Sequence, residues 1–123
     1  QPARAQLVRV AQVTGPLVTL DLRAEREIFV TNRFTVYALF PQCHFSLHIL
    51  PGRQNLNTVF ALGRSILNPL YDTDAGELMR GYGGGGHTGM GACQVDHADA
   101  DRVLGELVSA LTGRAAAGAE GRG

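Results

Sequence analysis

Glycine is concentrated in one short segment of this chain, and that segment limits the folds open to it. Seven of the 16 glycines lie between Gly81 and Gly91, and four of them are consecutive. A glycine loses more backbone freedom on folding than any other residue and adds no side chain to a core. The segment therefore predicts either a place where a ligand approaches the main chain closely or a flexible connector between a helix and a strand.

Before the glycine segment, short β-rich runs are separated by turn residues. We expect strands at residues 7–13, 17–22, 34–40, 44–50 and 57–62. The run at 34–40 is apolar almost throughout, which is typical of a strand covered on both faces. The run at 44–50 alternates, so one face carries Phe45, Leu47 and Ile49.

Past residue 69 the apolar period lengthens from two to about 3.6 residues, which is typical of a helix. Asp74 and Glu77 have capping-box spacing, so we expect a short helix there that ends at Gly81. Residues 90–95 suit a last strand, and Asp96 can cap a final helix. That helix has an apolar stripe made of Val103, Leu104, Leu107, Val108 and Leu111. The order of elements predicts an α/β domain with a mixed sheet of about five strands and helices packed on it.

Length and charge narrow the class of protein. The 123 residues suffice for one domain, and 11 arginines balance 11 acidic residues in a chain without lysine. A neutral chain has no general field to gather nucleic acid or an anionic membrane, so any anion site must be local. No apolar run is long enough to span a bilayer. We expect a soluble, cytoplasmic protein with no membrane partner, its two cysteines being small core residues rather than a disulfide framework.

The chain divides near its C-terminal end. We expect one domain at residues 1–112 and a disordered tail at 113–123, which has no apolar stripe to pack. Because the sequence starts at Gln1 rather than Met, we expect the isolated C-terminal fragment of a longer protein.

The glycine segment can form an anion site. Consecutive N–H groups in a glycine loop can converge into a nest that binds an anion, and His87 adds a donor at its lip. The loop is not a P-loop, which runs from strand to helix and needs a lysine. Positive charge must instead come from an arginine, and Arg64 with its neighbour Ser65 is the best candidate. The expected substrate-binding residues are Gly83, Gly84, Gly85, Gly86, His87, Arg64 and Ser65.

These residues resemble a known family. The Arg64–Ser65 pair, the helix opened by Asp74 and the run Gly84-Gly85-Gly86-His87 are similar to the DHHA1 domain of DHH-family phosphoesterases. The resemblance covers residues 13–111, and the run at 32–41 is closer to the exopolyphosphatase-related branch. One departure is the stretch 88–91, where many relatives carry an additional cation.

The resemblance implies a function for the chain and a missing partner. A DHHA1 domain binds phosphate or nucleotide substrate, while an N-terminal DHH domain holds Mn or Mg and hydrolyses the phosphoester. This chain has no DHH motif, so it should hold no catalytic residue and no metal, and it should be inactive alone. The expected ligands are a phosphate-containing small molecule, a nucleotide or a short oligonucleotide. The alternative is a non-catalytic nucleotide- or RNA-binding module, such as the related domain that accompanies alanyl-tRNA synthetases.

Aspartates at the start of the final helix are the other candidates for a metal site. Asp96, Asp99 and Asp101 lie close together in the sequence. We interpret them as helix-capping and first-turn carboxylates, which complement the helix dipole, rather than as metal ligands.

Overall fold

The computed structural model describes residues 2–65 and 73–113. Of the tail expected at 113–123, it describes Gly113, which ends the last helix in a left-handed conformation; residues 114–123 lie outside the described range. The elements follow in the order α1 (Pro2–Val10), β1 (Ala11–Thr14), β2 (Leu17–Asp21), α2 (Arg33–Leu39), β3 (Phe45–Pro51), η1 (Arg53–Asn55), β4 (Thr58–Arg64), α3 (Ala75–Arg80), β5 (Gly85–His87), β6 (Met90–Val95), η2 (His97–Asp99) and α4 (Ala100–Thr112).

The strands form one mixed sheet of six strands in the order β1-β2-β3-β4-β6-β5. Strands β2 and β3 are parallel and the other neighbouring pairs are antiparallel. The α/β class with a mixed sheet is confirmed, with one strand more than expected.

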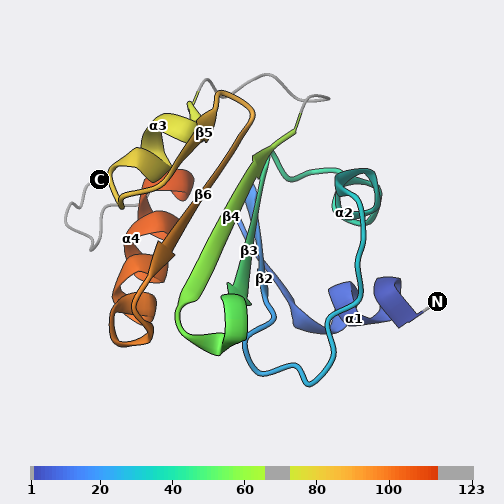
Figure 1. Cartoon of the computed structure of the whole chain (residues 1–123). Helices are drawn as coiled ribbons and strands as arrows, with labels where there is room; N and C mark the ends of the chain where they lie inside the picture. The colour runs from blue at the N-terminus through green and yellow to red at the C-terminus, as the bar shows by residue number, and fades with distance from the viewer. Residues whose placement is uncertain (1, 66–72, 114–123) are drawn as a thin grey trace.

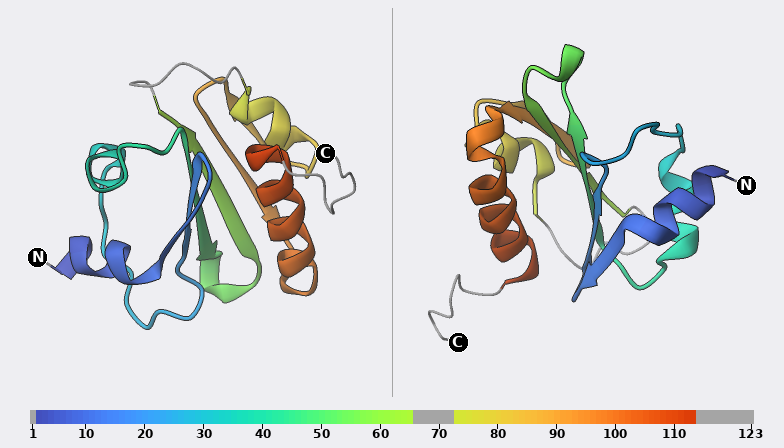
Figure 2. Two further views of the ribbon diagram at one scale, coloured as in Figure 1. Left: turned by 180° about the vertical axis from the view of Figure 1, so that it is seen from behind. Right: turned by 90° about the horizontal axis from the view of Figure 1, so that it is seen from below.

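Helices cover the two faces of the sheet unequally (Figures 1 and 2). On one face α3 and α4 pack over the centre of the sheet, and that core contains Leu17, Phe45, Leu47, Ile49, Phe60, Leu62, Ala75, Met79, Cys93, Ala100, Val103, Leu107 and Leu111. On the other face α1 and α2 form a smaller core with Leu7, Val18, Leu20, Val36 and Cys43. Both cysteines are free and buried, as expected.

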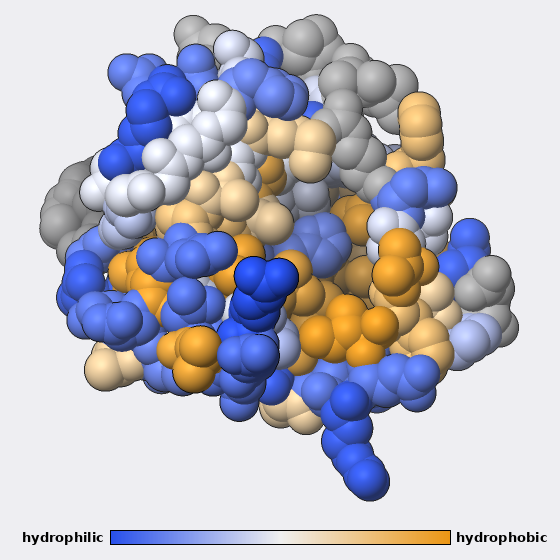
Figure 3. All heavy atoms as spheres, in the orientation of Figure 1, coloured by the Kyte–Doolittle hydropathy of each residue, from blue (hydrophilic) through white to orange (hydrophobic). Residues whose placement is uncertain are grey.

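The second core leaves part of the sheet uncovered. None of its described residues belongs to β4, β5 or β6. On these strands the side facing away from α3 and α4 carries Val59, Ala61, Met90, Ala92 and Gln94, and we call it the open half-face. The last three of these side chains are exposed. Viewed as in Figure 1, several hydrophobic residues are visible near the middle of the molecule, with hydrophilic residues among them and around the rim (Figure 3).

The strand expected at 34–40 is instead the helix α2, Arg33–Leu39. Asn32 caps α2, since its side chain accepts a hydrogen bond from the Thr35 N–H at 3.0 Å. The helix turns Val36 into the smaller core, buries Tyr37 and leaves Phe34 68% exposed. The β-favouring residue types in this run are therefore overridden by the cap and by packing on one face.

Two other expectations about the elements need correction. The run at 7–13 is split, because its first residues belong to α1 and strand pairing starts only at Ala11. The final helix begins at Ala100, after a 3₁₀ turn, and the Asp96 side chain makes no capping hydrogen bond. Its apolar stripe is confirmed, because Val103, Leu107 and Leu111 are buried.

The strands at 17–22, 44–50, 57–62 and 90–95 are confirmed to within two residues. In the helix that follows residue 73, the Asp74 side chain accepts a hydrogen bond from the Glu77 N–H at 3.0 Å, as its spacing predicts. Among the described residues, no helix has the length and apolar character needed to cross a membrane.

Candidate functional site

Three segments meet at one end of the sheet: the end of β4, the turn between β5 and β6, and the start of α3. The Arg64 N–H donates to the Gly89 carbonyl at 3.0 Å, and the Ala75 N–H donates to the Thr88 carbonyl at 3.0 Å. The Arg64 guanidinium donates through Nη1 to the Thr73 carbonyl at 3.2 Å. The structure thus brings Arg64 beside the segment that carries His87, although the two are 23 positions apart in the sequence.

The imidazole of His87 is exposed and its ring orientation is fixed by the next turn. The Gly89 N–H donates to Nδ1 of His87 at 3.2 Å. A neutral imidazole that accepts at Nδ1 carries its hydrogen on Nε2. His87 is therefore set to donate from Nε2 to a group in solvent, which suits an anionic oxygen.

The side chains of Arg64 and His87 reach this end of the sheet from opposite faces. Arg64 pairs with Phe45, whose side chain lies in the core under α3 and α4. His87 pairs with Met90, which lies on the open half-face. A ligand that contacts both must therefore sit across the end of the sheet, over the turn at Thr88 and Gly89.

Ser65 is buried beneath this end of the sheet. Its side chain is 3% exposed and its N–H donates to the His44 carbonyl at 2.8 Å. It therefore supports the end of β4, and its burial gives no support to the substrate contact expected for Ser65 from the sequence.

The first two glycines of the run do not offer their N–H groups to the nest that the sequence suggests. The N–H groups of Gly83 and Gly84 donate to the carbonyls of Arg80 and Met79 and so close the C-terminal end of α3. The run then continues as strand β5, paired with β6. Gly83 and Gly84 consequently have no N–H free for an anion, and they lie at the opposite end of β5 from His87.

Close packing explains several of these glycines. Helix α3 lies directly on the β5–β6 hairpin, and a Cβ added at Gly76 would overlap the backbone of Gly86. Gly86 also has a φ of 143°, which an L side chain rarely adopts. An added Cβ at Gly91 would overlap the Ala75 carbonyl. The segment is thus built for backbone-to-backbone contact with α3, which holds the His87 turn against the start of that helix.

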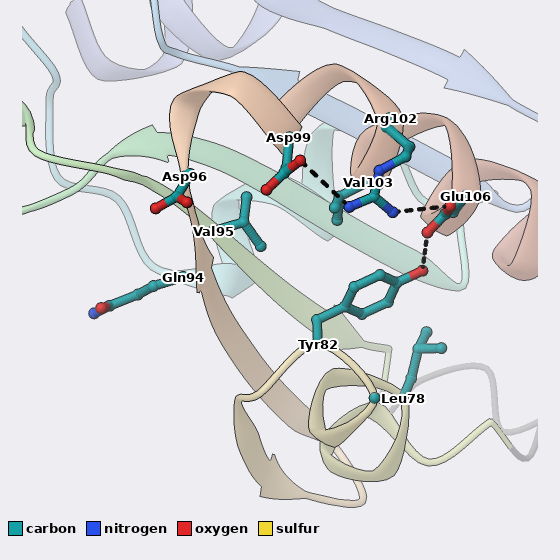
Figure 4. Close-up of a pocket in the computed structure, with 10 residues that line it drawn as sticks. Leu78, Tyr82, Gln94, Val95, Asp96, Asp99, Arg102, Val103 and Glu106 are labelled. Carbon is teal, nitrogen blue, oxygen red and sulfur yellow. Dashed lines mark hydrogen bonds and ion pairs between the residues drawn. The ribbon is translucent and has the colours of Figure 1, made fainter.

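Two pockets lie near the glycine run. One, of about 310 Å³, is on the open half-face and is lined by Val59, Gly83, Gly84, Ala92, Cys93 and Gln94. The other, of about 800 Å³, lies between Tyr82 and α4 (Figure 4). Neither pocket is lined by Arg64 or His87.

The larger pocket is unsuited to a phosphate. The Tyr82 hydroxyl donates to Glu106 at 2.9 Å, and Arg102 lies 3.1 Å from Glu106 and 3.6 Å from Asp99. Burial and then the bond to Glu106 raise the pKa of Tyr82 to about 12. Because Arg102, which lines this pocket, is already paired with carboxylates, we prefer the end of the sheet as the anion site.

No group of three or more His, Cys, Asp or Glu side chains within residues 2–65 and 73–113 could hold a metal ion. Asp99 and Asp101 are in ion pairs, with Arg102 and Arg23 respectively. Asp99 and Asp101 therefore form ion pairs at the start of α4, but neither Asp96 nor Asp99 makes the side-chain capping hydrogen bond expected from the sequence.

One buried residue at this end of the sheet could not be found from the sequence. The Tyr37 hydroxyl lies 3.1 Å from both the Gly63 carbonyl and the Ser46 hydroxyl. Tyr37 comes from α2, for which the sequence predicts a strand. No sequence pattern therefore indicated that Tyr37 would lie beside β4. The Asn32 cap, three residues before Thr35, is the signal that could have identified this helix.

Comparison with solved structures shows a strong similarity to a phosphodiesterase. A pGpG-specific phosphodiesterase, PggH from Vibrio cholerae, matches with a TM-score of 0.88 and 45% sequence identity, covering 91% of this chain and 38% of its own. An uncharacterized protein from Helicobacter pylori G27 matches with a TM-score of 0.46 and 12% identity, covering 89% of this chain and 30% of its own. The second is too distant to support an argument.

No protein-family model and no curated protein sequence matches the chain. The chain spans 38% of the phosphodiesterase from Vibrio cholerae. In fold and in sequence, it is therefore closely similar to one part of a phosphodiesterase.

Proposed function

We propose that this chain is the substrate-binding domain, of the DHHA1 type, of a DHH-family phosphoesterase that cleaves a short nucleotide phosphodiester such as pGpG. The observation that carries the proposal is the 45% identity to a pGpG-specific phosphodiesterase over 91% of the chain. That similarity favours a dinucleotide over polyphosphate as substrate. It also favours an enzyme domain over a non-catalytic nucleotide- or RNA-binding module.

The end of the sheet offers the groups that a phosphate requires. His87 presents an Nε2–H donor, because its Nδ1 is occupied by the Gly89 N–H. The half-buried Arg64 brings a permanent positive charge to the other side of the same turn. Charge-assisted hydrogen bonds from such groups to phosphate oxygens are stronger than neutral ones. In this proposal the two residues bind and orient the substrate.

The divalent metals belong to another part of the protein in this proposal. A DHH domain would hold Mn or Mg, and these ions would supply the activation of water and the charge neutralisation that phosphoester hydrolysis needs. The described residues contain no cluster that fits such an ion. The role of this chain is to hold the nucleotide in place for that domain.

Calorimetry on the 123-residue chain tests the proposal. We expect it to bind pGpG more tightly than GMP or inorganic phosphate. Arg64→Ala should weaken the binding of pGpG about ten- to a hundredfold, because one charge-assisted contact is lost. Arg53→Ala is the matched control, since Arg53 is exposed in η1 at the opposite end of β4. Equal affinity in both variants, or no binding by the unmodified chain, would contradict the proposal.

A further inference from the structure

The peptide group that joins Gly63 to Arg64 is held at both of its ends. The Tyr37 hydroxyl donates to the Gly63 carbonyl at 3.1 Å, and the Arg64 N–H donates to the Gly89 carbonyl at 3.0 Å. This peptide is where β4 leaves its pairing with β6, since Gly63 pairs with Met90, the first residue of β6. The orientation of this peptide therefore determines where the main chain places Arg64 at the end of the sheet.

The hydrogen bonds continue from this peptide to His87. The Gly89 residue that accepts from Arg64 also donates its own N–H to Nδ1 of His87. A single series of contacts thus runs from Tyr37 through the peptide and Gly89 to the imidazole. Both residues of the proposed phosphate site, Arg64 and His87, are attached to this series.

Tyr37 is well suited to anchor the series. Its side chain is 7% exposed, and it comes from α2, on the opposite side of the sheet from α3. Since a phenol has one hydrogen, the two contacts of Tyr37 are both satisfied when Ser46 donates to Tyr37 and Tyr37 donates to Gly63. Ser46 is also buried. Loss of the phenol would leave the buried Gly63 carbonyl without this donor.

We propose that Tyr37 is a positioning residue for substrate: its hydroxyl fixes the Gly63–Arg64 peptide and, through Gly89, the ring of His87. This inference rests on the proposed function, because it assigns Tyr37 to the site made by Arg64 and His87. Tyr37 itself is too deeply buried to be the primary contact of a ligand at the end of the sheet.

Tyr37→Phe tests the inference, with Tyr82→Phe as the matched control. Both variants remove one phenolic hydrogen bond, but the Tyr82 bond to Glu106 lies on the α4 side of the sheet. Calorimetry with pGpG, well below the melting temperature, should show roughly three- to tenfold weaker binding by Tyr37→Phe. Tyr82→Phe should bind as the unmodified chain does. A role in stability alone would lower the melting temperature and leave the dissociation constant of the folded chain unchanged.

A second readout needs no ligand. In Tyr37→Phe the amide resonance of Gly89 and the ring resonances of His87 should move, whereas in Tyr82→Phe they should not. If Tyr37→Phe does not fold, Ser46→Ala keeps the Tyr37–Gly63 bond and should weaken binding by a smaller factor.

The outcomes separate the two proposals. If the unmodified chain does not bind pGpG, the proposed function fails and the role of Tyr37 fails with it. If the unmodified chain binds and Arg64→Ala weakens it, but Tyr37→Phe has the same affinity and the same Gly89 resonance, the positioning role alone is overturned.

Discussion

At the scale of single residues, His87 is the donor on which the proposed site most depends. Its ring is exposed and held by a single hydrogen bond from Gly89, so removing it should not disturb the core. His87→Ala should weaken the binding of pGpG about ten- to a hundredfold, because one hydrogen bond to a charged oxygen is lost. Calorimetry measures the affinity and thermal unfolding provides the control. Unchanged affinity, or a large fall in melting temperature, would contradict this role.

Two adjacent glycines should respond very differently to substitution by alanine. Gly86 has a positive φ and its added Cβ would overlap the Met90 carbonyl, whereas Gly85 has no positive φ and its nearest neighbour is the Arg80 Cγ at 3.9 Å. Gly86→Ala should lower the free energy of unfolding by about 2–4 kcal/mol. Gly85→Ala should change it by less than about 0.5 kcal/mol. Urea denaturation measures both, and similar losses in the two variants would be inconsistent with this packing.

At the scale of secondary structure, the bond between Tyr82 and Glu106 ties the residues after α3 to α4 (Figure 4). The folded pKa of Tyr82, about 12, lies above the ordinary value of 10.0. The folded state thus holds this proton more tightly than the unfolded state does. The contribution to stability is complete below pH 10 and is lost as the pH rises through about 12.

This titration can be measured by the ultraviolet absorbance of the phenolate in the folded chain. The Tyr82 phenol should ionise near pH 12, and the absorbance change at that pH should be smaller in Tyr82→Phe by the contribution of one phenolate. Ionisation of every tyrosine near the ordinary value would show that the bond to Glu106 is absent in solution.

Elements with a strong local signal could be predicted from the sequence, and those decided by tertiary contacts could not. The helix opened by Asp74 and the stripe of α4 were predicted because a cap and a 3.6-residue period are local features. The run that forms α2 predicts a strand because Phe, Thr, Val and Tyr favour strands, but the Asn32 cap and the packing of Val36 in the smaller core make it a helix. Strand β5 consists of Gly85, Gly86 and His87, which show no apolar alternation. The sequence therefore did not predict that this segment pairs with β6.

At the scale of the whole molecule, the sequence predicted that Arg64 and His87 would lie together but not where the glycines of the predicted site would be. Arg64 and His87 do lie at one end of the sheet. The glycines between Tyr82 and His87 instead close α3 and pack against it. This distinction depends on contacts between α3 and the hairpin, which composition does not specify.

In the proposed enzyme, this chain binds the substrate and another domain hydrolyses it, so the chain alone should have no hydrolytic activity. Incubated with Mn²⁺ and pGpG, the 123-residue chain alone should leave the dinucleotide intact, because hydrolysis is assigned to a metal-binding domain. Chromatography of the reaction measures this. Turnover that scales with the concentration of the chain and survives replacement of Asp96, Asp99 and Asp101 by Asn would contradict the assignment.

The central claim, that a nucleotide phosphate binds at the end of the sheet, is tested most directly by mapping the backbone amides that respond to pGpG. In a titration followed by ¹H–¹⁵N correlation spectra, we expect the largest shifts at Arg64, Ser65 and residues 87–89. The amide resonances of residues that line the pocket between Tyr82 and α4 should not shift. Shifts that gather around Tyr82 and Glu106 and spare residues 87–89, or no shifts at all, would contradict the site proposed for this chain.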